Sequence, residues 1–406
     1  MSTILQINIS ANRGSTGKIA EGIGRLVLAE GWESYIAYGG SHRSSASNLI
    51  RIGGKWNIYT HVLQSRLFDN HGLASRSVTK RFVEQLRAIK PDIIHLHNIH
   101  DYFLNYPLLF SYLMETGVPI VWTLHDCWPF TGHCAHFDHL GCEKWKTGCN
   151  HCEGLSLYPR SWFSDRSERN YRLKKQYFGS VVGNTTLVPV SEWIAKYAKQ
   201  SFLADAKMKI IHNGIDMELF APQPSKGLRE RFGLGDRFVV LGVASPWTPT
   251  KGLKDFIRLH SMLPQEEYAI FVVGLSEKQL KELPEGVVGI TRTDSPHELA
   301  AIYSMADVFL NPTYEDNFPT TNLEAMACGT PVLVYDTGGC KEAVTAETGS
   351  VLKQGDIEGA AKIITYMRQK NVKFKKDACR QHAEQFFDEK SAFREYIELY
   401  KQLLNS

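Results

Sequence analysis

Short apolar runs alternate with longer amphipathic stretches along the whole chain. The runs are continuously rich in Val, Ile and Leu, which is typical of parallel strands buried on both faces. We predict β-strands at residues 3–10, 35–38, 92–98, 120–125, 186–191, 238–244, 268–275, 287–291, 308–313 and 331–336. Between them, residues 17–30, 78–89, 296–305 and 321–328 have the periodicity of amphipathic helices.

This alternation of strand and helix predicts right-handed βαβ units and open, doubly wound sheets. It occurs once in each half of the chain, and 406 residues are enough for two or three domains. A polar, Pro-rich stretch at 221–227 places the boundary near residues 209–224. We therefore predict an α/β protein with two Rossmann-like domains that face each other across a cleft, 1–210 and 211–385. A helix with one apolar stripe, 386–406, ends the chain, and its periodicity fits packing on either domain.

The composition is that of an ordinary globular protein, with 43% hydrophobic and 22% charged residues. It excludes collagen and global disorder. No apolar run reaches the roughly 18 residues that span a bilayer. The first ten residues also lack the basic and apolar regions of a secretory signal, so we expect a cytoplasmic protein.

The charge is divided unevenly. Residues 1–210 carry 24 Lys and Arg against 16 Asp and Glu, whereas the remainder carries 22 against 27. A basic first half suggests an anionic partner, such as a phosphorylated ligand or a lipid surface, although chance asymmetry explains it equally well. In residues 166–178, basic residues are interspersed with aromatic ones. This pattern fits a helix that rests on an anionic membrane, and it also fits the solvent-exposed face of an ordinary helix. No nucleic-acid recognition motif accompanies the charge, so we expect no nucleic-acid partner.

Five of the eight cysteines lie between residues 127 and 152. In a cytosolic protein such a cluster points to a metal site rather than to disulfides. Four of them would supply the thiolates of a tetrahedral structural zinc site: Cys134, Cys142, Cys149 and Cys152. The zinc ion would stabilise an insertion, 127–153, that otherwise lacks a core. The alternative is that reduced cysteines pack as small apolar groups. Four thiolates leave no open position, so this zinc would not be catalytic.

The segment 311–331 is the strongest candidate for chemistry. A polar loop follows a predicted strand and opens into a helix near Thr320, where open α/β sheets bind ligands. The free N–H groups of that helix start, with the hydroxyls of Thr320 and Thr321, suit a diphosphate. Asp316 in the loop and Glu324 in the helix could accept hydrogen bonds from sugar and ribose hydroxyls. For an arbitrary acid pair, a capped surface helix with solvated carboxylates would be the better interpretation.

This segment resembles the E-x7-E region of retaining glycosyltransferases of family 4, which have the two-domain GT-B fold. The first acid is Asp316 here rather than Glu. The motif at 316–331 looks like that of the colanic-acid and capsular-polysaccharide branch. Further motifs of the family occur in the expected order at 91–98 (PDIIHLHN), 123–126 (TLHD), 190–193 (VSEW), 213–216 (NGID) and 251–252 (KG). With the GT-B fold, we expect the C-terminal helix to cross back to the first domain.

The resemblance implies a role for each matching residue of the second half. Glu324 would hold the donor ribose, and Asp316, with backbone groups of Asn317 and Phe318, would hold the transferred sugar. Lys251 would neutralise the leaving diphosphate as charge grows in the transition state.

In the first half, His125 ends a predicted strand and by resemblance contacts the donor sugar. The glycine-rich turn after the first strand, with Gly14, Ser15 and Thr16, would face the donor phosphates and the acceptor. This turn does not satisfy the P-loop pattern, because Ile19 follows Lys18.

The resemblance implies a cytoplasmic hexosyltransferase that transfers a sugar, with retention, from a UDP- or GDP-sugar. The acceptor would be a polyprenyl-pyrophosphate-linked oligosaccharide of capsule or exopolysaccharide synthesis, reached by peripheral contact with the inner membrane. No cofactor would be required for catalysis. The alternatives are a GT-B enzyme with a soluble acceptor, such as a sucrose-phosphate-type synthase or an epimerase, and a non-catalytic binding module.

Overall fold

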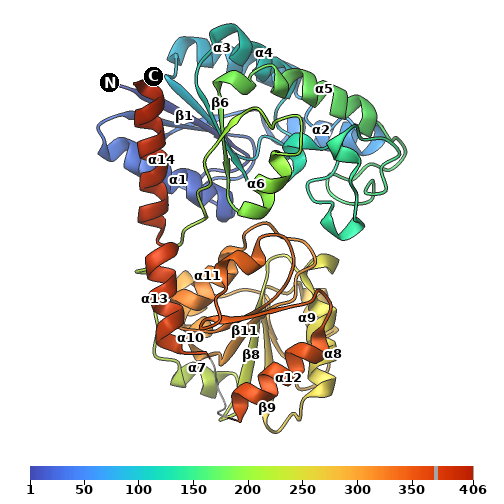
Figure 1. Ribbon diagram of the computed structural model, residues 1–406, viewed down its shortest axis with the longest axis vertical. Helices are drawn as coiled ribbons and strands as arrows, with labels where there is room; N and C mark the ends of the chain where they lie inside the picture. The colour runs from blue at the N-terminus through green and yellow to red at the C-terminus, as the bar shows by residue number, and fades with distance from the viewer. Residues whose placement is uncertain (370–373, 406) are drawn as a thin grey trace. The chain divides into compact units, whose positions relative to one another are not determined.

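The structure is a computed structural model that describes residues 1–369 and 374–405. The chain forms two compact units. The first unit contains Met1–His212 together with the C-terminal residues from Ala392 onward, and the second contains Asn213–Ser391 (Figure 1). Each unit has its own parallel sheet, as the alternation of strands and helices predicts.

The sheet of the first unit has seven strands in the order β3-β2-β1-β4-β5-β6-β7, all parallel. The chain therefore winds outward in two directions from the β1–β4 pair. The strands are β1 (Thr3–Asn8), β2 (Glu33–Tyr38), β3 (Asn48–Arg51), β4 (Ile93–Leu96), β5 (Ile120–Leu124), β6 (Thr185–Pro189) and β7 (Lys207–Met208). The sequence pattern does not predict β3 and β7, because both are short edge strands without a continuous apolar run.

Helices cover both faces of this sheet. Leu5, Leu96 and Trp122 point to a large core that α3, α4 and α5 complete, and Figure 1 shows these three helices side by side. Ile4 and Val121 point to the opposite face, where α1 and α14 pack. The helices of the first unit are α1 (Gly14–Ala29), α2 (Lys55–Phe68), α3 (Arg76–Ile89), α4 (Tyr106–Thr116), α5 (Ser167–Gly179), α6 (Glu192–Ala198) and, beginning in the second unit, α14 (Glu389–Leu404).

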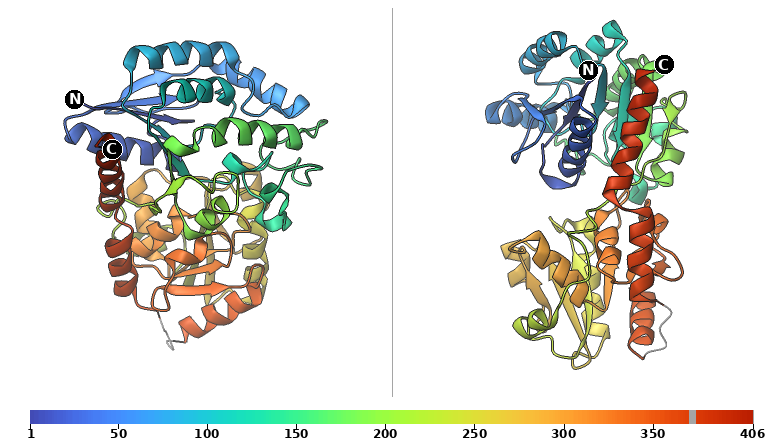
Figure 2. Two further views of the ribbon diagram at one scale, coloured as in Figure 1. Left: turned by 45° about the horizontal axis from the view of Figure 1, so that its top comes forward. Right: turned by 90° about the vertical axis from the view of Figure 1, so that its left-hand side faces the viewer.

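Two buried hydrogen bonds fix α14 to the first sheet. The Tyr400 hydroxyl lies 2.6 Å from Nδ1 of His95, and the Tyr396 hydroxyl lies 3.1 Å from Oγ1 of Thr123. Phe393 fills the space beside Gly22 of α1, where an added Cβ would lie 2.1 Å from its ring. The last helix is thus part of the core of the first unit, and Figure 2 shows it running alongside that unit.

The sheet of the second unit has six parallel strands in the order β10-β9-β8-β11-β12-β13. Its strands are β8 (Phe238–Val243), β9 (Tyr268–Val273), β10 (Val288–Ile290), β11 (Val308–Asn311), β12 (Val332–Tyr335) and β13 (Gly349–Leu352). Its helices are α7 (Lys226–Arg231), α8 (Leu253–Met262), α9 (Glu277–Lys281), α10 (Pro296–Met305), α11 (Thr320–Ala327), α12 (Ile357–Arg368) and α13 (Lys376–Phe386).

The helices of the second unit also form two layers. Phe256 of α8 and Ile364 of α12 share a core with Val240 and Leu333 of the sheet. On the other face, Tyr303 of α10 packs edge-on against Phe309, at 5.6 Å between ring centroids. No helix among the described residues is long and apolar enough to cross a bilayer.

Candidate active site

A polar site of the second unit lies where its strand order reverses. β8 and β11 are neighbours, and the strands that follow each of them are added on opposite sides of this pair. Open parallel sheets bind ligands outside the carboxyl ends of such a pair. Lys251 follows β8 and Asp316 follows β11, so the topology brings these two predicted site residues to the same edge.

Lys251 and Asp316 form an ion pair there. Nζ of Lys251 lies 2.6 Å from Oδ2 of Asp316 and 3.2 Å from the carbonyl oxygen of Glu315. The two side chains are 29% and 23% exposed. Burial alone would lower the pKa of Lys251, but the carboxylate of Asp316 outweighs it and raises the pKa above its ordinary value. Lys251 is therefore a partly accessible ammonium group at neutral pH, which suits an anionic ligand.

A glycine positions Lys251 against the loop that carries Asp316. Gly252 has φ +78°, and an added Cβ would lie 2.2 Å from the carbonyl oxygen of Pro312. The backbone N–H of Tyr314 donates to the carbonyl oxygen of Thr250 at 2.7 Å. The turns after β8 and β11 are thus in direct backbone contact, and only glycine fits at position 252 without a shift.

The turn after β12 holds the same loop from the other side. Gly338 has φ +54°, and an added Cβ would lie 1.8 Å from the carbonyl oxygen of Asp316. The N–H of Gly339 donates to the carbonyl oxygen of Asn317 at 2.8 Å, and Nδ2 of Asn213 donates to that of Phe318 at 3.1 Å. Oδ1 of Asp316 accepts from the N–H of Asn317 at 2.9 Å. The loop is therefore fixed before any ligand binds.

Helix α11 begins directly after this loop. Pro319 is its N-cap residue and has no side-chain acceptor, so the first turn, with Thr320 and Thr321, starts without a side-chain cap. Glu324 lies one turn further and its Oε2 accepts from the Tyr303 hydroxyl at 2.9 Å. Sequence reasoning missed Tyr303, since its place in a predicted helix identifies it only as a core residue.

In the first unit, the strand order reverses at β1 and β4. Gly14, Ser15 and Thr16, predicted as a turn, form the first turn of α1, and Gly14 has φ +70°. Nδ2 of Asn8 lies 3.2 Å from Oγ1 of Thr16, and Oδ1 of Asn8 accepts from the N–H of Asn98, which follows β4, at 3.3 Å. Asn8 thus ties the glycine-rich turn to the neighbouring strand end.

His125 follows β5 and belongs to a chain of hydrogen bonds. Its Nε2 lies 3.3 Å from Nδ1 of His97, whose Nε2 lies 3.0 Å from Oε1 of Gln6. An amide oxygen only accepts, so Nε2 of His97 carries the proton and its Nδ1 accepts one from His125. Burial lowers the pKa of His125 to about 4. His125 is therefore a neutral hydrogen-bonding group at physiological pH.

Next to it lies an ion pair that sequence reasoning missed. Nε2 of His100 is 2.7 Å from Oδ2 of Asp126, and Nδ1 of His100 is 2.9 Å from the Tyr158 hydroxyl. Burial would lower the pKa of His100, but Asp126 and Asp101 raise it to about 10. His100 is hence a buried cation. Asp126 belongs to the TLHD motif, but nothing in its spacing identifies His100 as its partner.

The cysteine-rich insertion packs into the main core of the first unit, contrary to the expectation that it lacks a core. Trp145 lies 5.5 Å from Phe130, 5.1 Å from Phe137 and 5.3 Å from Tyr197 of α6, measured between ring centroids. These aromatic residues continue the main core of the first unit. Sequence reasoning underestimated them because they are scattered over a segment without regular periodicity.

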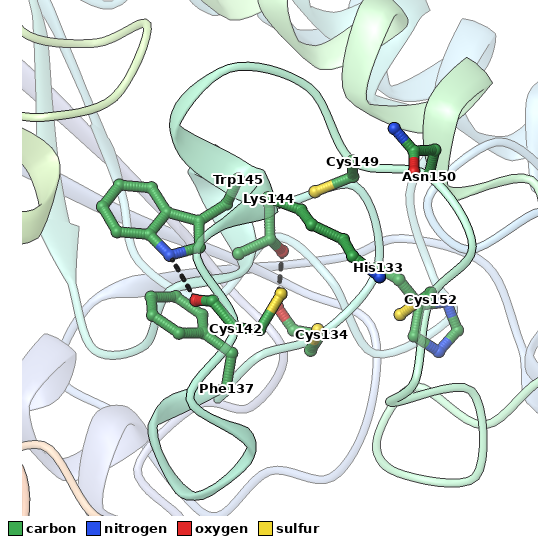
Figure 3. Close-up of a pocket in the computed structure, with 10 residues that line it drawn as sticks. His133, Cys134, Phe137, Cys142, Lys144, Trp145, Cys149, Asn150 and Cys152 are labelled. Atoms are coloured by element: carbon green, nitrogen blue, oxygen red, sulfur yellow. Dashed lines mark hydrogen bonds between the residues drawn. The ribbon is translucent and has the colours of Figure 1, made fainter.

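The four cysteines predicted as metal ligands, Cys134, Cys142, Cys149 and Cys152, line one small pocket of about 20 Å³ (Figure 3). The neighbouring thiol of Cys134 lowers the pKa of Cys152 to about 7. Within residues 1–369 and 374–405, however, no group of three or more His, Cys, Asp or Glu side chains is arranged to hold a metal ion. The zinc site therefore stays a prediction.

The basic aromatic stretch 166–178 is not a membrane-facing helix. It lies mostly in α5, where Tyr171 and Phe178 are buried in the core. Lys174 is buried too, with Nζ 3.6 Å from the centroid of the Trp128 ring and 2.6 Å from the Trp128 carbonyl oxygen. Helix α5 completes the helical layer over the sheet, so Tyr171 and Phe178 face the core and are not exposed for contact with a bilayer.

Comparison with known proteins identifies the family. The sequence profile of glycosyltransferase family 4 matches residues 23–219, and that of the glycosyl transferases group 1 matches residues 228–385. The chain belongs to the family 4 glycosyltransferases. Over 382 residues this glycosyltransferase is 26% identical to WcaC of Escherichia coli K12, named for a role in colanic acid biosynthesis; the alignment covers 87% of this chain and 88% of WcaC.

Over 192 residues this glycosyltransferase is 31% identical to a GDP-mannose-dependent phosphatidylinositol monomannoside mannosyltransferase of Mycolicibacterium smegmatis. It covers 42% of this chain and 50% of that protein. Among solved structures, the sucrose-phosphate synthase of Thermosynechococcus elongatus superposes with a TM-score of 0.71 at 17% identity, covering all of both chains. Anabaena HepE in complex with UDP-glucose superposes with a TM-score of 0.66 at 16% identity, covering 99% of this chain and all of that one. These likenesses confirm the GT-B fold.

Proposed function

We propose that this glycosyltransferase transfers a sugar, with retention at the anomeric carbon, from a nucleotide diphosphate donor to a lipid-linked oligosaccharide. The observation that carries the proposal is the Lys251–Asp316 pair at the β8–β11 edge. It places a cation and a hydroxyl-binding carboxylate side by side, which is what a sugar joined to a diphosphate requires. That HepE was solved with UDP-glucose supports a nucleotide-sugar donor.

We assign the donor contacts to the second unit. Lys251 binds the diphosphate and leaves Asp316 free to accept hydrogen bonds from the sugar. The uncapped first turn of α11, with Thr320 and Thr321, adds backbone N–H donors for a phosphate. Glu324, oriented by Tyr303, accepts from the ribose hydroxyls.

In the proposed reaction the acceptor hydroxyl attacks the anomeric carbon on the face from which the nucleotide diphosphate leaves. The new carbon–oxygen bond forms as the bond to the phosphate oxygen breaks, and that phosphate oxygen takes the hydroxyl proton. Lys251 stabilises the charge that develops on the diphosphate. His125 is neutral and contributes a hydrogen bond rather than a charge to the donor sugar.

The experiment is transfer or hydrolysis of UDP-glucose and GDP-mannose by the purified enzyme, with the product anomer identified by NMR. Lys251→Ala should lower kcat/KM by roughly a hundredfold or more, the size of effect seen when one group that stabilises transition-state charge is lost. Glu324→Ala should also lower kcat/KM, because the ribose hydroxyls lose their acceptor. Lys254→Ala, an exposed lysine of α8, is the matched control and should act like the parent. Equal activity of Lys251→Ala and Lys254→Ala would refute the site, and an inverted product would refute retention.

The names of two relatives indicate the class of acceptor. WcaC is named for colanic acid biosynthesis, and the mycobacterial relative acts on a phosphatidylinositol derivative. We therefore propose a polyprenyl-pyrophosphate-linked oligosaccharide as acceptor and work at the inner face of the membrane. A water-soluble sugar phosphate that serves as well as the lipid-linked acceptor would overturn this.

We also propose that the insertion binds a structural zinc ion with no part in the reaction. Four thiols surround one pocket, and His133 lines it as well. Nδ1 of His133 donates to Oδ1 of Asp69 at 2.8 Å, and its buried Nε2 has no hydrogen-bond partner in the described structure. A carboxylate that holds a histidine in this way is the usual second layer of a zinc ligand, so we propose His133 as a replacement for one of the four thiolates in a tetrahedral site. The thiol side chains would have to turn toward the cavity to complete the site.

Zinc analysis of protein never exposed to chelator tests this proposal. We expect about one zinc per chain in the parent and a loss in the Cys149→Ser, Cys152→Ser double variant. His133→Gln should lower zinc affinity, whereas Cys379→Ser, at a buried cysteine of α13, should not. Less than about half a zinc per chain in the parent would contradict the proposal.

A further inference from the structure

Helix α2 has its apolar side turned toward solvent. Trp56, Tyr59 and Leu63 lie at i, i+3 and i+7, so they share one face, and they are 83%, 64% and 52% exposed. The buried residues of the same helix are polar: His61 and Ser65. Nδ1 of His61 lies 2.7 Å from the Ser75 hydroxyl. Three large apolar side chains on one exposed helix face form a patch of the kind that marks an interaction site.

A second apolar segment lies next to the C-terminal end of α2. Trp162 and Phe163 are 49% and 80% exposed, and they follow α2 by almost a hundred residues. The N–H of Trp162 donates to the carbonyl oxygen of Arg66 at 2.7 Å, and the Ser164 hydroxyl donates to that of Leu67 at 3.0 Å. These bonds join the two segments into one surface, which we call the α2 surface: residues 51–68 and 158–166.

Cations surround the apolar side chains of the α2 surface. Its two segments contain five basic residues and a single acid, Asp165. The guanidinium of Arg66 lies 5.2 Å from the centroid of the Trp162 ring, and that of Arg166 lies 6.0 Å from the Phe68 ring. The basic residues of the α2 surface are Arg51, Lys55, Arg66, Arg160 and Arg166.

The N-terminal end of α2 borders an open hollow of about 670 Å³. Arg51, Lys55 and Arg81 of α3 line it, and no acidic residue does. The hollow lies beside Trp56, so three cations stand next to the most exposed aromatic side chain of the surface. An arrangement of basic groups beside exposed Trp, Tyr and Phe matches the interface of an anionic bilayer, where aromatic rings sit at headgroup level.

We propose that the α2 surface binds the first unit to anionic lipid bilayers. Trp56, Tyr59 and Phe163 enter the interfacial layer, while Arg51, Lys55 and Arg81 contact lipid phosphates. The proposal deepens the proposed function, because it names the surface through which the enzyme would reach a lipid-linked acceptor. It differs from the sequence expectation in its location, since the aromatic side of α5 is buried.

The test is co-sedimentation of the full-length protein with vesicles of phosphatidylcholine alone and with 30% phosphatidylglycerol (roughly the anionic content of a bacterial membrane). We expect binding to the anionic vesicles that weakens as salt is raised. The Trp56→Ala, Phe163→Ala double variant should lose roughly tenfold or more in partition coefficient, because two large apolar side chains no longer insert. Arg51→Gln with Lys55→Gln should abolish the preference for phosphatidylglycerol.

Tyr366→Ala is the matched control, since this α12 residue is also aromatic and 51% exposed. It should bind vesicles like the parent. Equal vesicle binding of the parent and the Trp56→Ala, Phe163→Ala variant would overturn the proposal. It would also be overturned if the parent bound no vesicles and instead formed a dimer that these two substitutions dissociate. Donor hydrolysis, measured in parallel without lipid, should be unchanged in both variants. Vesicle binding without hydrolysis by the parent would refute the proposed function and support the α2 surface.

Discussion

Gly252→Ala tests whether the backbone contact beside Lys251 creates the site. An L-residue at φ +78° costs about 1–2 kcal/mol on its own. The added Cβ would also lie 2.2 Å from the carbonyl oxygen of Pro312, and a backbone atom cannot rotate away. Overpacking of this kind costs about 1–3 kcal/mol more. We therefore expect the free energy of unfolding to fall by about 2–5 kcal/mol.

Gly235→Ala separates the two costs. Gly235 also has a positive φ, +54°, but an added Cβ there meets no atom within 4 Å. It should lose only the conformational cost of about 1–2 kcal/mol. Urea unfolding of both variants measures the difference, which is the cost of the contact with Pro312.

Activity provides the second measurement for the same pair. Relief of the overlap moves Lys251 away from the loop of Asp316, and a displacement near 1 Å can cost roughly a hundredfold in rate. Gly252→Ala should therefore have a lower kcat/KM than the parent, measured as the release of nucleotide diphosphate from the donor. Gly235→Ala should have the same kcat/KM as the parent. If both variants lose the same stability and both retain full activity, the close approach does not position Lys251 and the reasoning is wrong.

Two further predictions concern the first unit. Burial keeps the pKa values of His95 and His97 well below the ordinary value of a histidine, so both side chains are neutral in the folded protein. As the pH drops through 6.5, these histidines gain protons only in the unfolded chain, and the free energy of unfolding should therefore fall. Each histidine should contribute about 1.4 kcal/mol to the loss between pH 7.5 and pH 5.5, measured by urea unfolding; a His95→Gln variant with an unchanged pH dependence would contradict this. Tyr400→Phe should cost about 1–3 kcal/mol, since it leaves the buried Nδ1 of His95 unpaired, and an unchanged denaturation midpoint would show that the bond does not stabilise α14.

Continuous apolar runs allowed most of the sheet to be predicted from the sequence. Every strand predicted from such a run is present, because burial on both faces leaves a local signal. The strands that were missed depend on their neighbours instead: β13, Gly349–Leu352, is half-exposed and pairs with β12 at the sheet edge. Helix α2 was also missed, since its fully buried residues are polar and several of its large apolar residues are exposed, so it has no clear apolar stripe.

The site could be predicted as residues but not as contacts. Lys251 and Asp316 were identified separately, through motifs 65 positions apart, and only the strand order brings them to 2.6 Å. His100, which pairs with Asp126, and Tyr303, which donates to Glu324, were not identified at all, because only the fold brings them to these partners. A motif marks the chemistry of one position, whereas a hydrogen bond across the fold depends on how distant turns approach each other.

The position of α14 has a consequence for how the protein is made. Ile4, Ile23 and Val121 share a core with Tyr400, which is translated only after the second unit. During synthesis, the part of this sheet face that α14 covers therefore stays exposed while the entire second unit is translated. The nascent chain must tolerate this exposed apolar surface throughout the interval, and the core of the N-terminal unit is complete only once α14 has been made.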